Sequence, residues 1–445
     1  MTRVFYASTL FGAMSLAAAI DAGMFGERSE PRLLIVSNNT NIPEISDGFE
    51  RSAGFEPLLH RFDEIVRWND VIAPLHPSDW VPSAAEVPMM SRLMRGHLGL
   101  DEPVTELVVE SIAVAPARTI GMLLRECPVT VYSDGLMSYG PTRDELPPDI
   151  GRRTTRLLHL DLLPSVTPLL LRENDVATEA IPESAFLKVV AELPGPPVDA
   201  GPDPMIVGQY LAPLGILTLD EELRLHADML EALAARGHRR VIFKPHPAAG
   251  RAHVQPLQEA AARSGVELTV ADDGLPAEVW FAAGHPALVV SCFSTALFTA
   301  ARYFGLATAT MGTELVLNRV TPYENSNRVP ATIVDATVPR LSRDGRITEP
   351  PRADVSELLP AVGYCMQANR LWDLRDAAVS YLQAHGRDRY FKKRRLERLG
   401  LVAPPPYRSR TVRRAARAGR RTASRVRTAW TARTQTPPVV AGRRP

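Results

Sequence analysis

A carboxylate, a histidine and a pair of hydroxyls each stand directly after a short apolar run in this chain. The carboxylate is Asp134, which follows the run 129–132 and precedes Gly135. A carboxylate held at a strand end by a glycine turn can take a proton from an incoming hydroxyl, and such general-base help contributes roughly 10²–10⁴-fold. An ordinary Asp-Gly turn explains the same residues, so the motif by itself leaves both interpretations open.

The histidine is His246, which lies within Lys244-Pro245-His246-Pro247 and after the run 240–243. The two prolines restrict the backbone and therefore the direction in which the imidazole points. A positioned histidine can donate a hydrogen bond or a proton to a leaving phosphate, and Lys244 adds a positive charge beside it. A loop histidine without function is the alternative, because His-Pro pairs also occur elsewhere in the chain.

The hydroxyls are those of Ser294 and Thr295, between the run 287–290 and a helical pattern over 296–303. The unpaired N–H groups and the dipole of a helix N-terminus favour an anion, so this pair is a candidate phosphate site. A Ser/Thr N-cap that binds no ligand explains the pair equally well.

Glu278 lies in sequence between the histidine and the hydroxyls. It could accept hydrogen bonds from ribose hydroxyls, as an acidic residue does in dinucleotide-binding folds. A solvent-facing acid in a first helical turn is the alternative, because helix starts favour negative charge. Taken together, the four motifs favour transfer from a nucleoside phosphate donor to a hydroxyl acceptor.

These residues require a scaffold that brings strand ends together. Short apolar runs alternate with helical patterns along the whole chain, which predicts parallel sheets covered on both faces. The predicted strands are 4–8, 33–37, 70–74, 105–110, 128–132, 156–162, 205–210, 239–244, 266–271, 287–291, 306–310 and 331–334. The predicted helices include 9–22, 114–126, 218–236, 254–264, 276–283, 294–303 and a long helix near 353–384.

A proline- and glycine-rich stretch over 192–204 interrupts this alternation and predicts a linker. We therefore expect an α/β protein of the GT-B class, in which two Rossmann-like, doubly wound domains face a cleft. The expected domains are 1–195, with the candidate base and the acceptor site, and 196–385, which binds the nucleotide-activated donor. Residues 386–445 are expected to form a basic helix over 387–398 and a disordered arginine-rich tail.

The order of these motifs resembles the bacterial polysialyltransferase family of GT-B sialyltransferases. That family has an acidic-acidic-Gly triplet, a His-Pro pair and a Ser/Thr pair, which here correspond to Ser133-Asp134-Gly135, His246-Pro247 and Ser294-Thr295. The segments 7–12, 21–23 and 208–211 are also similar, and the resemblance covers about residues 3–385. One departure is that the first acidic position of the triplet is occupied by Ser133.

The resemblance implies an inverting, metal-independent sialyltransferase that uses CMP-sialic acid and needs no cofactor. It implies that Asp134 is the base and that His246 donates to the leaving CMP phosphate. The donor-binding residues would be Lys244, Pro247, Glu278, Ser294 and Thr295. The partners would be a nucleotide-sugar donor and a glycan or glycolipid acceptor. Two alternatives stay open: a CDP-glycerol-type glycerophosphotransferase, and a catalytically silent GT-B module that binds a nucleotide or a glycan.

Charge is distributed unevenly along the chain. The net charge is +1, but the segment from Arg408 to Arg444 holds twelve arginines and no acidic residue, so the remainder is acidic. Such a tail predicts peripheral attachment to an anionic membrane surface, with a solubilising tail that has no target as the alternative. The acidic body and the scarcity of aromatic residues in the tail argue against nucleic acid.

The N-terminal apolar stretch over 4–20 allows two interpretations. It is consistent with a secretory signal, but a strand, an alanine-rich helix and a second strand at 33–36 explain it better as a βαβ opening. Three scattered cysteines form neither a metal-ligand spacing nor a disulfide framework, which fits a reducing compartment. We therefore expect a cytoplasmic protein.

Overall fold

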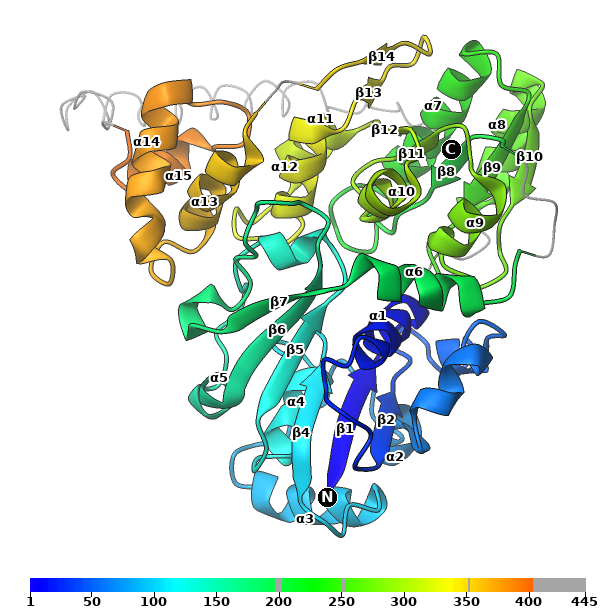
Figure 1. The fold of residues 1–445 in the computed structure, drawn as a ribbon. Helices are drawn as coiled ribbons and strands as arrows, with labels where there is room; N and C mark the ends of the chain where they lie inside the picture. The colour runs from blue at the N-terminus through cyan, green and yellow to red at the C-terminus, as the bar shows by residue number, and fades with distance from the viewer. Residues whose placement is uncertain (197–201, 248, 250–252, 351–352, 403–445) are drawn as a thin grey trace, which may run out of the picture. The chain divides into compact units, whose positions relative to one another are not determined.

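The computed structural model describes residues 1–196, 202–247, 249, 253–350 and 353–402 (Figure 1). The chain divides into two compact units, Met1–Lys392 and Lys393–Pro445. Both sheets belong to the first unit. In the second, the structure describes one short helix, α15 (Lys393–Arg398), within the basic helix predicted over 387–398. The arginine-rich tail lies outside the described residues.

The first half of the larger unit contains a seven-stranded parallel sheet with the order β3-β2-β1-β4-β5-β6-β7. Its strands are β1 (Thr2–Ala7), β2 (Arg32–Val36), β3 (Glu64–Arg67), β4 (Val104–Val109), β5 (Val129–Ser133), β6 (Thr154–Leu160) and β7 (Ala177–Ile181). Its helices are α1 (Leu10–Asp21), α2 (Trp68–Ile72), α3 (Val87–His97), α4 (Ala117–Leu123), α5 (Pro148–Arg153) and α6 (Glu183–Glu192).

The second half contains another seven-stranded sheet, with the order β10-β9-β8-β11-β12-β13-β14, in which the β13–β14 pair alone is antiparallel. Its strands are β8 (Met205–Val207), β9 (Arg240–Lys244), β10 (Glu267–Val270), β11 (Val289–Ser291), β12 (Thr308–Thr310), β13 (Arg340–Leu341) and β14 (Ile347–Thr348). Its helices are α7 (Leu219–Ala235), α8 (Gln255–Ser264), α9 (Ala277–Gly284), α10 (Ala296–Phe304), α11 (Thr313–Arg319) and α12 (Arg328–Thr337), followed by α13 (Val355–Met366) and α14 (Arg375–His385).

Both sheets have the strand order of a Rossmann fold, so the predicted GT-B class is confirmed. In each sheet the order reverses between the first and the fourth strand: between β1 and β4 in one, and between β8 and β11 in the other. Open parallel sheets bind ligands at the carboxyl ends of the strands beside such a switch point. The predicted boundary at 195–196 falls between α6 and β8, and it stays a prediction.

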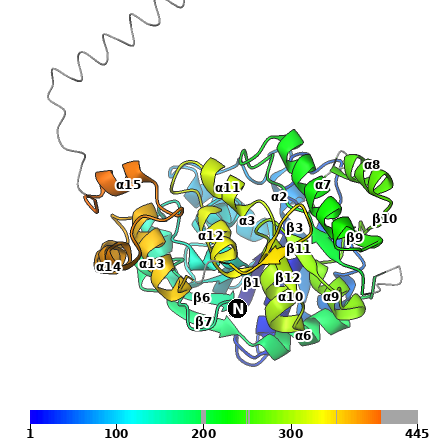
Figure 2. The same ribbon diagram turned by 90° about the horizontal axis from the view of Figure 1, so that it is seen from above.

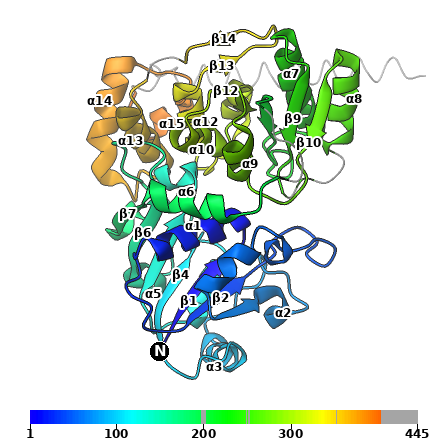
Figure 3. The same cartoon turned by 45° about the vertical axis from the view of Figure 1, so that its right-hand side comes forward.

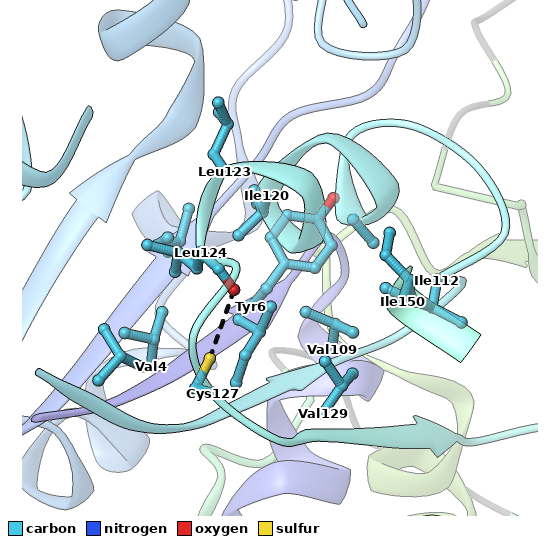
Figure 4. Packing of buried hydrophobic residues seen from close by; sticks show 14 of the residues in the cluster. Val4, Tyr6, Val109, Ile112, Ile120, Leu123, Leu124, Cys127, Val129 and Ile150 are labelled. Carbon is cyan, nitrogen blue, oxygen red and sulfur yellow. Dashed lines mark hydrogen bonds between the residues drawn. The ribbon is translucent and has the colours of Figure 1, made fainter. Parts of the chain in front are cut away.

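Alternating side chains of β1 cover both faces of the first sheet. Val4 and Tyr6 pack with Val109, Val129 and Ile120 in one large apolar cluster (Figure 4). Phe5, which points to the opposite face, contacts Phe25 and Phe62 edge to face. Burial on both faces explains why these strands are continuous apolar runs. The same packing confirms the βαβ opening, because α1 is buried along nearly its whole length.

Two predicted strands are wrong. The run 70–74 overlaps α2, whose buried Trp68 and Ile72 are four residues apart on one helix face, and the strand lies earlier, at β3. The run 331–334 lies inside α12, and so short an apolar run cannot by itself distinguish a buried helix segment from a buried strand. The long helix near 353–384 is divided into α13 and α14 by the short turn Trp372–Leu374.

The two halves are connected by more than one segment of the chain. Helix α6 contacts α1 of the first half (Figure 3) and α9 of the second (Figures 2 and 3). Between α13 and α14, Gln367 and Arg370 donate hydrogen bonds to the backbone carbonyls of Thr142 and Arg143. The last helices of this unit therefore contact the first half, close to the loop that follows β5.

Candidate active site

A pocket of about 420 Å³ lies where strand ends of the first half meet the start of α10. Glu110, Asp134 and Gly135 of the first half line it together with Thr295 and Ser326 of the second. The first and third motifs singled out in the sequence therefore meet in one pocket, although they are 161 residues apart. This is the site that the structure offers for the predicted chemistry.

A direct hydrogen bond connects the two halves at this pocket. The Thr295 hydroxyl accepts from the Leu136 N–H at 3.2 Å. A Cβ added at Gly135 would lie 2.9 Å from the same hydroxyl oxygen, so the close approach requires glycine. The neighbouring Ser294 hydroxyl accepts from the Ala296 N–H at 3.2 Å, as a capping serine does. Phosphate binding by these two hydroxyls stays a prediction.

Glu278 is buried in the first turn of α9 rather than facing solvent. Its carboxylate accepts a hydrogen bond of 2.6 Å from the Thr299 hydroxyl on α10. Burial raises the pKa of Glu278, and the charge of Asp134 raises it further. The carboxylates of the two halves therefore interact, while ribose binding by Glu278 stays a prediction.

Lys244 ends β9 and directs its ammonium into the protein. Its Nζ donates to the carbonyl of Ala271 at 2.9 Å and to the carboxylate of Asp273 at 3.2 Å. Asp273 also accepts from the Trp280 indole N–H at 2.8 Å and from the Leu275 N–H. Lys244 thus holds the segment that leads into α9. The donor-binding role predicted for it is not tested by these contacts.

His246 stacks on Tyr210, with ring centroids 5.5 Å apart and planes 12° from parallel. Burial lowers the pKa of His246 to about 4, and the neighbouring His253 contributes. The imidazole is therefore neutral near pH 7, and in that form it can donate a hydrogen bond through one ring N–H. Donation to a leaving phosphate stays a prediction. Pro247 follows His246 at the surface.

The segment 208–211 organises the second half of the site. Gln209 accepts a hydrogen bond of 2.7 Å from the Phe293 N–H, and so bridges the ends of β8 and β11. The next residue, Tyr210, supports His246. The sequence offered this segment as a point of resemblance only, because the contacts depend on strand order.

The sequence interpretation missed Glu110. It follows β4 directly and lines the pocket with Asp134, which follows the neighbouring strand β5. Burial raises the pKa of both carboxyl groups, and the charge of Asp134 raises the pKa of Glu110 further. The signal in the sequence is an acidic residue at the end of an apolar run. It identifies Glu110 as a site residue only once β4 is known to lie beside β5.

Among the described residues, no group of three or more histidine, cysteine or acidic side chains is arranged to hold a metal ion. Within the same ranges, no helix combines the length and the apolar character that crossing a bilayer requires.

Comparison with family models decides the family. Residues 3–313 match the model of alpha-2,8-polysialyltransferases, and this range includes all four motifs. The chain belongs to this family. This member of the polysialyltransferase family is therefore a glycosyltransferase, and the resemblance seen in its motifs is confirmed. No curated protein matches the chain.

Solved structures similar to this polysialyltransferase-family protein are distant. They include a putative UDP-N-acetylglucosamine 2-epimerase from Listeria monocytogenes, with 10% identity, 92% of this chain and 99% of that chain covered, and a TM-score of 0.46. A sialyltransferase from Photobacterium damselae has 13% identity, 75% and 96% coverage, and a TM-score of 0.39. A 2,6-sialyltransferase from Photobacterium sp. JT-ISH-224, in complex with CMP and lactose, has 13% identity, 75% coverage of both chains and a TM-score of 0.40.

Proposed function

We propose that this protein transfers sialic acid, or a related sugar, from a CMP-activated donor to a hydroxyl of a glycan, with inversion and without a metal ion. The observation that carries the proposal is the meeting of Asp134 and Thr295, which belong to two different family motifs, in one pocket. Membership of the polysialyltransferase family supports the choice of donor.

In the proposed reaction, Asp134 takes the proton of the acceptor hydroxyl while the oxygen of that hydroxyl forms a bond to the anomeric carbon of the donor sugar. The bond between that carbon and the phosphate oxygen breaks, and its electron pair stays on CMP. Burial raises the pKa of Asp134, which makes it a stronger base than an exposed aspartate.

Negative charge that develops on the departing phosphate requires fixed donors. We assign this role to the neutral imidazole of His246 and to the N-terminal end of α10 with its two hydroxyls. The stacking on Tyr210 restrains the His246 ring, which supports this assignment. The Thr295 hydroxyl accepts from the Leu136 N–H through a lone pair, so this hydrogen bond does not prevent its own O–H from donating to a phosphate oxygen.

A donor panel tests the proposal. The full-length protein is incubated with CMP-sialic acid, CDP-glycerol or UDP-glucose, and hydrolysis and transfer to a sialylated glycan are followed by chromatography. Turnover of CMP-sialic acid is the expected result. Turnover of CDP-glycerol alone would instead support the glycerophosphotransferase, and binding without any turnover would support the silent module.

We also propose that the protein attaches to the cytoplasmic face of an anionic membrane through the arginine-rich segment Arg408–Arg444. Each arginine near such a surface contributes about 1 kcal/mol of attraction, which salt weakens. Full-length protein should co-sediment with vesicles that contain phosphatidylserine, whereas protein ending at residue 402 should not. Equal sedimentation of the two proteins would contradict the attachment.

A further inference from the structure

Glu110 occupies the switch point of the first sheet. It follows β4, while Ser8 follows β1, and the strand order reverses between these two strands. In the second half, Gln209 and Phe293 bridge the corresponding strands β8 and β11 beside His246. Glu110 is thus placed where this class of fold positions groups that act on a ligand.

Ser8 holds one oxygen of the Glu110 carboxyl group with two hydrogen bonds. The backbone N–H of Ser8 donates to Oε1 at 2.7 Å, and the Ser8 hydroxyl donates to the same oxygen. A Cβ at Gly12 would lie 3.4 Å from Oε2 and 2.9 Å from the Tyr132 hydroxyl, so the chain approaches the carboxyl closely. Because Oε1 already accepts two hydrogen bonds, a proton on Glu110 belongs on Oε2.

Among the residues that the structure describes, no basic side chain is paired with Glu110. Asp134, which follows β5, carries the same charge. The hydroxyls of Tyr6 and Tyr132 remain neutral, because burial and the charge of Glu110 raise the pKa of each phenol and Asp134 raises that of Tyr132 further. Arg143 and Asp144, which also line the pocket, are exposed to solvent. Two neighbouring carboxyl groups in such surroundings retain one proton between them, because ionisation of both would place two negative charges close together.

We propose that Glu110 is a positioning residue for the transfer reaction and that it forms with Asp134 a carboxyl pair that shares one proton in the active enzyme. This inference rests on the proposed function. In the singly protonated pair, Asp134 is ionised as the base while Glu110 stays neutral. Loss of the second proton places two negative charges in the pocket that must admit an anionic donor.

The test is the pH profile of kcat/KM with CMP-sialic acid. In the wild-type protein, kcat/KM should rise with pH as the pair loses its first proton. It should then fall by about ten-fold as the pair loses its second proton. Glu110→Gln mimics the neutral form permanently, so its profile should rise in the same way and keep its plateau at alkaline pH. A merely structural role would lower kcat/KM equally at every pH.

Ser8→Ala gives a second readout. This variant removes one hydrogen bond that stabilises ionised Glu110, so the alkaline fall should move to higher pH by about one pH unit. Glu126→Gln, which removes an exposed carboxylate of the same half, should keep the wild-type profile. If Glu110→Gln does not fold, Ser8→Ala alone decides.

The outcomes separate the two proposals. Suppose that Asp134→Asn inactivates the protein at every pH, but that Glu110→Gln and Ser8→Ala both keep the alkaline fall of the wild type. This result would overturn the carboxyl pair and leave the proposed function intact. Full activity of Asp134→Asn would overturn the proposed function itself.

Discussion

Replacing Asp134 by asparagine should lower kcat for sialic acid transfer by about 10²–10⁴-fold and leave CMP binding nearly unchanged. Asparagine has the shape of aspartate, but its amide cannot take the proton of the acceptor hydroxyl. The measurements are initial rates with CMP-sialic acid and a glycan acceptor, together with calorimetric titration with CMP. A variant that keeps more than a tenth of the wild-type kcat would show that Asp134 is not the base.

The same substitution should make the protein more stable at neutral pH. Burial raises the pKa of Asp134 in the folded state, so the folded protein binds more protons than the unfolded chain. Folding stability then falls as pH rises from the ordinary aspartate pKa through the raised one. Asp134→Asn removes this penalty, so thermal unfolding at pH 8 should show a higher Tm than wild type, and the difference should shrink at pH 4. Glu126→Gln is the control, because its exposed carboxylate should show no such gain.

The second large effect is expected at Asp273. Asp273→Ala removes the counter-ion of buried Lys244 and the acceptor of the Trp280 indole, so it should destabilise the fold by about 3–5 kcal/mol. Urea unfolding of the variant, followed by circular dichroism, measures the loss. Asp272→Ala, which removes the exposed neighbouring carboxylate, should change stability by about 0.5 kcal/mol or less.

A double-mutant cycle makes this prediction specific. Lys244→Met removes the charge that Asp273 compensates, so the double variant should be less destabilised than the sum of the two single variants. Additive effects would show that the two side chains do not stabilise each other. Comparison of the KM for CMP-sialic acid in Lys244→Met and wild type then tests the donor-binding role predicted for Lys244.

The sequence predicted the buried strands better than the exposed ones. Central strands such as β1 and β2 are apolar throughout because both of their faces are covered, and this pattern is visible without a structure. Strand β7 was not predicted because it lies at the sheet edge and four of its five residues are exposed or half-buried. The run 331–334 of α12 is ambiguous for the opposite reason, since a short apolar run in a buried helix resembles a central strand.

The candidate site could be predicted only where its residues belong to local motifs. Asp134 and Thr295 each stand beside an apolar run, so strand-end reasoning finds them. Glu110 and Tyr210 depend on which strands are neighbours, and this is a property of the sheet order rather than of any short segment. Lys244 shows a further limit, because the sequence reveals its charge but not that Asp273 lies 3.2 Å from its ammonium.

The contacts made between α13 and α14 determine how the protein can be recombined with its relatives. Gln367 and Arg370 donate to backbone carbonyls, which do not depend on the side chains of that loop, whereas the ion pair of Arg172 with Asp373 requires two particular side chains. A chimaera joined at residue 196 should therefore take residues 355–392 from the same parent as its first half, or carry a matched pair at 172 and 373. A single junction at residue 196 therefore does not separate the two halves, because the segment between α13 and α14 contacts the first half again.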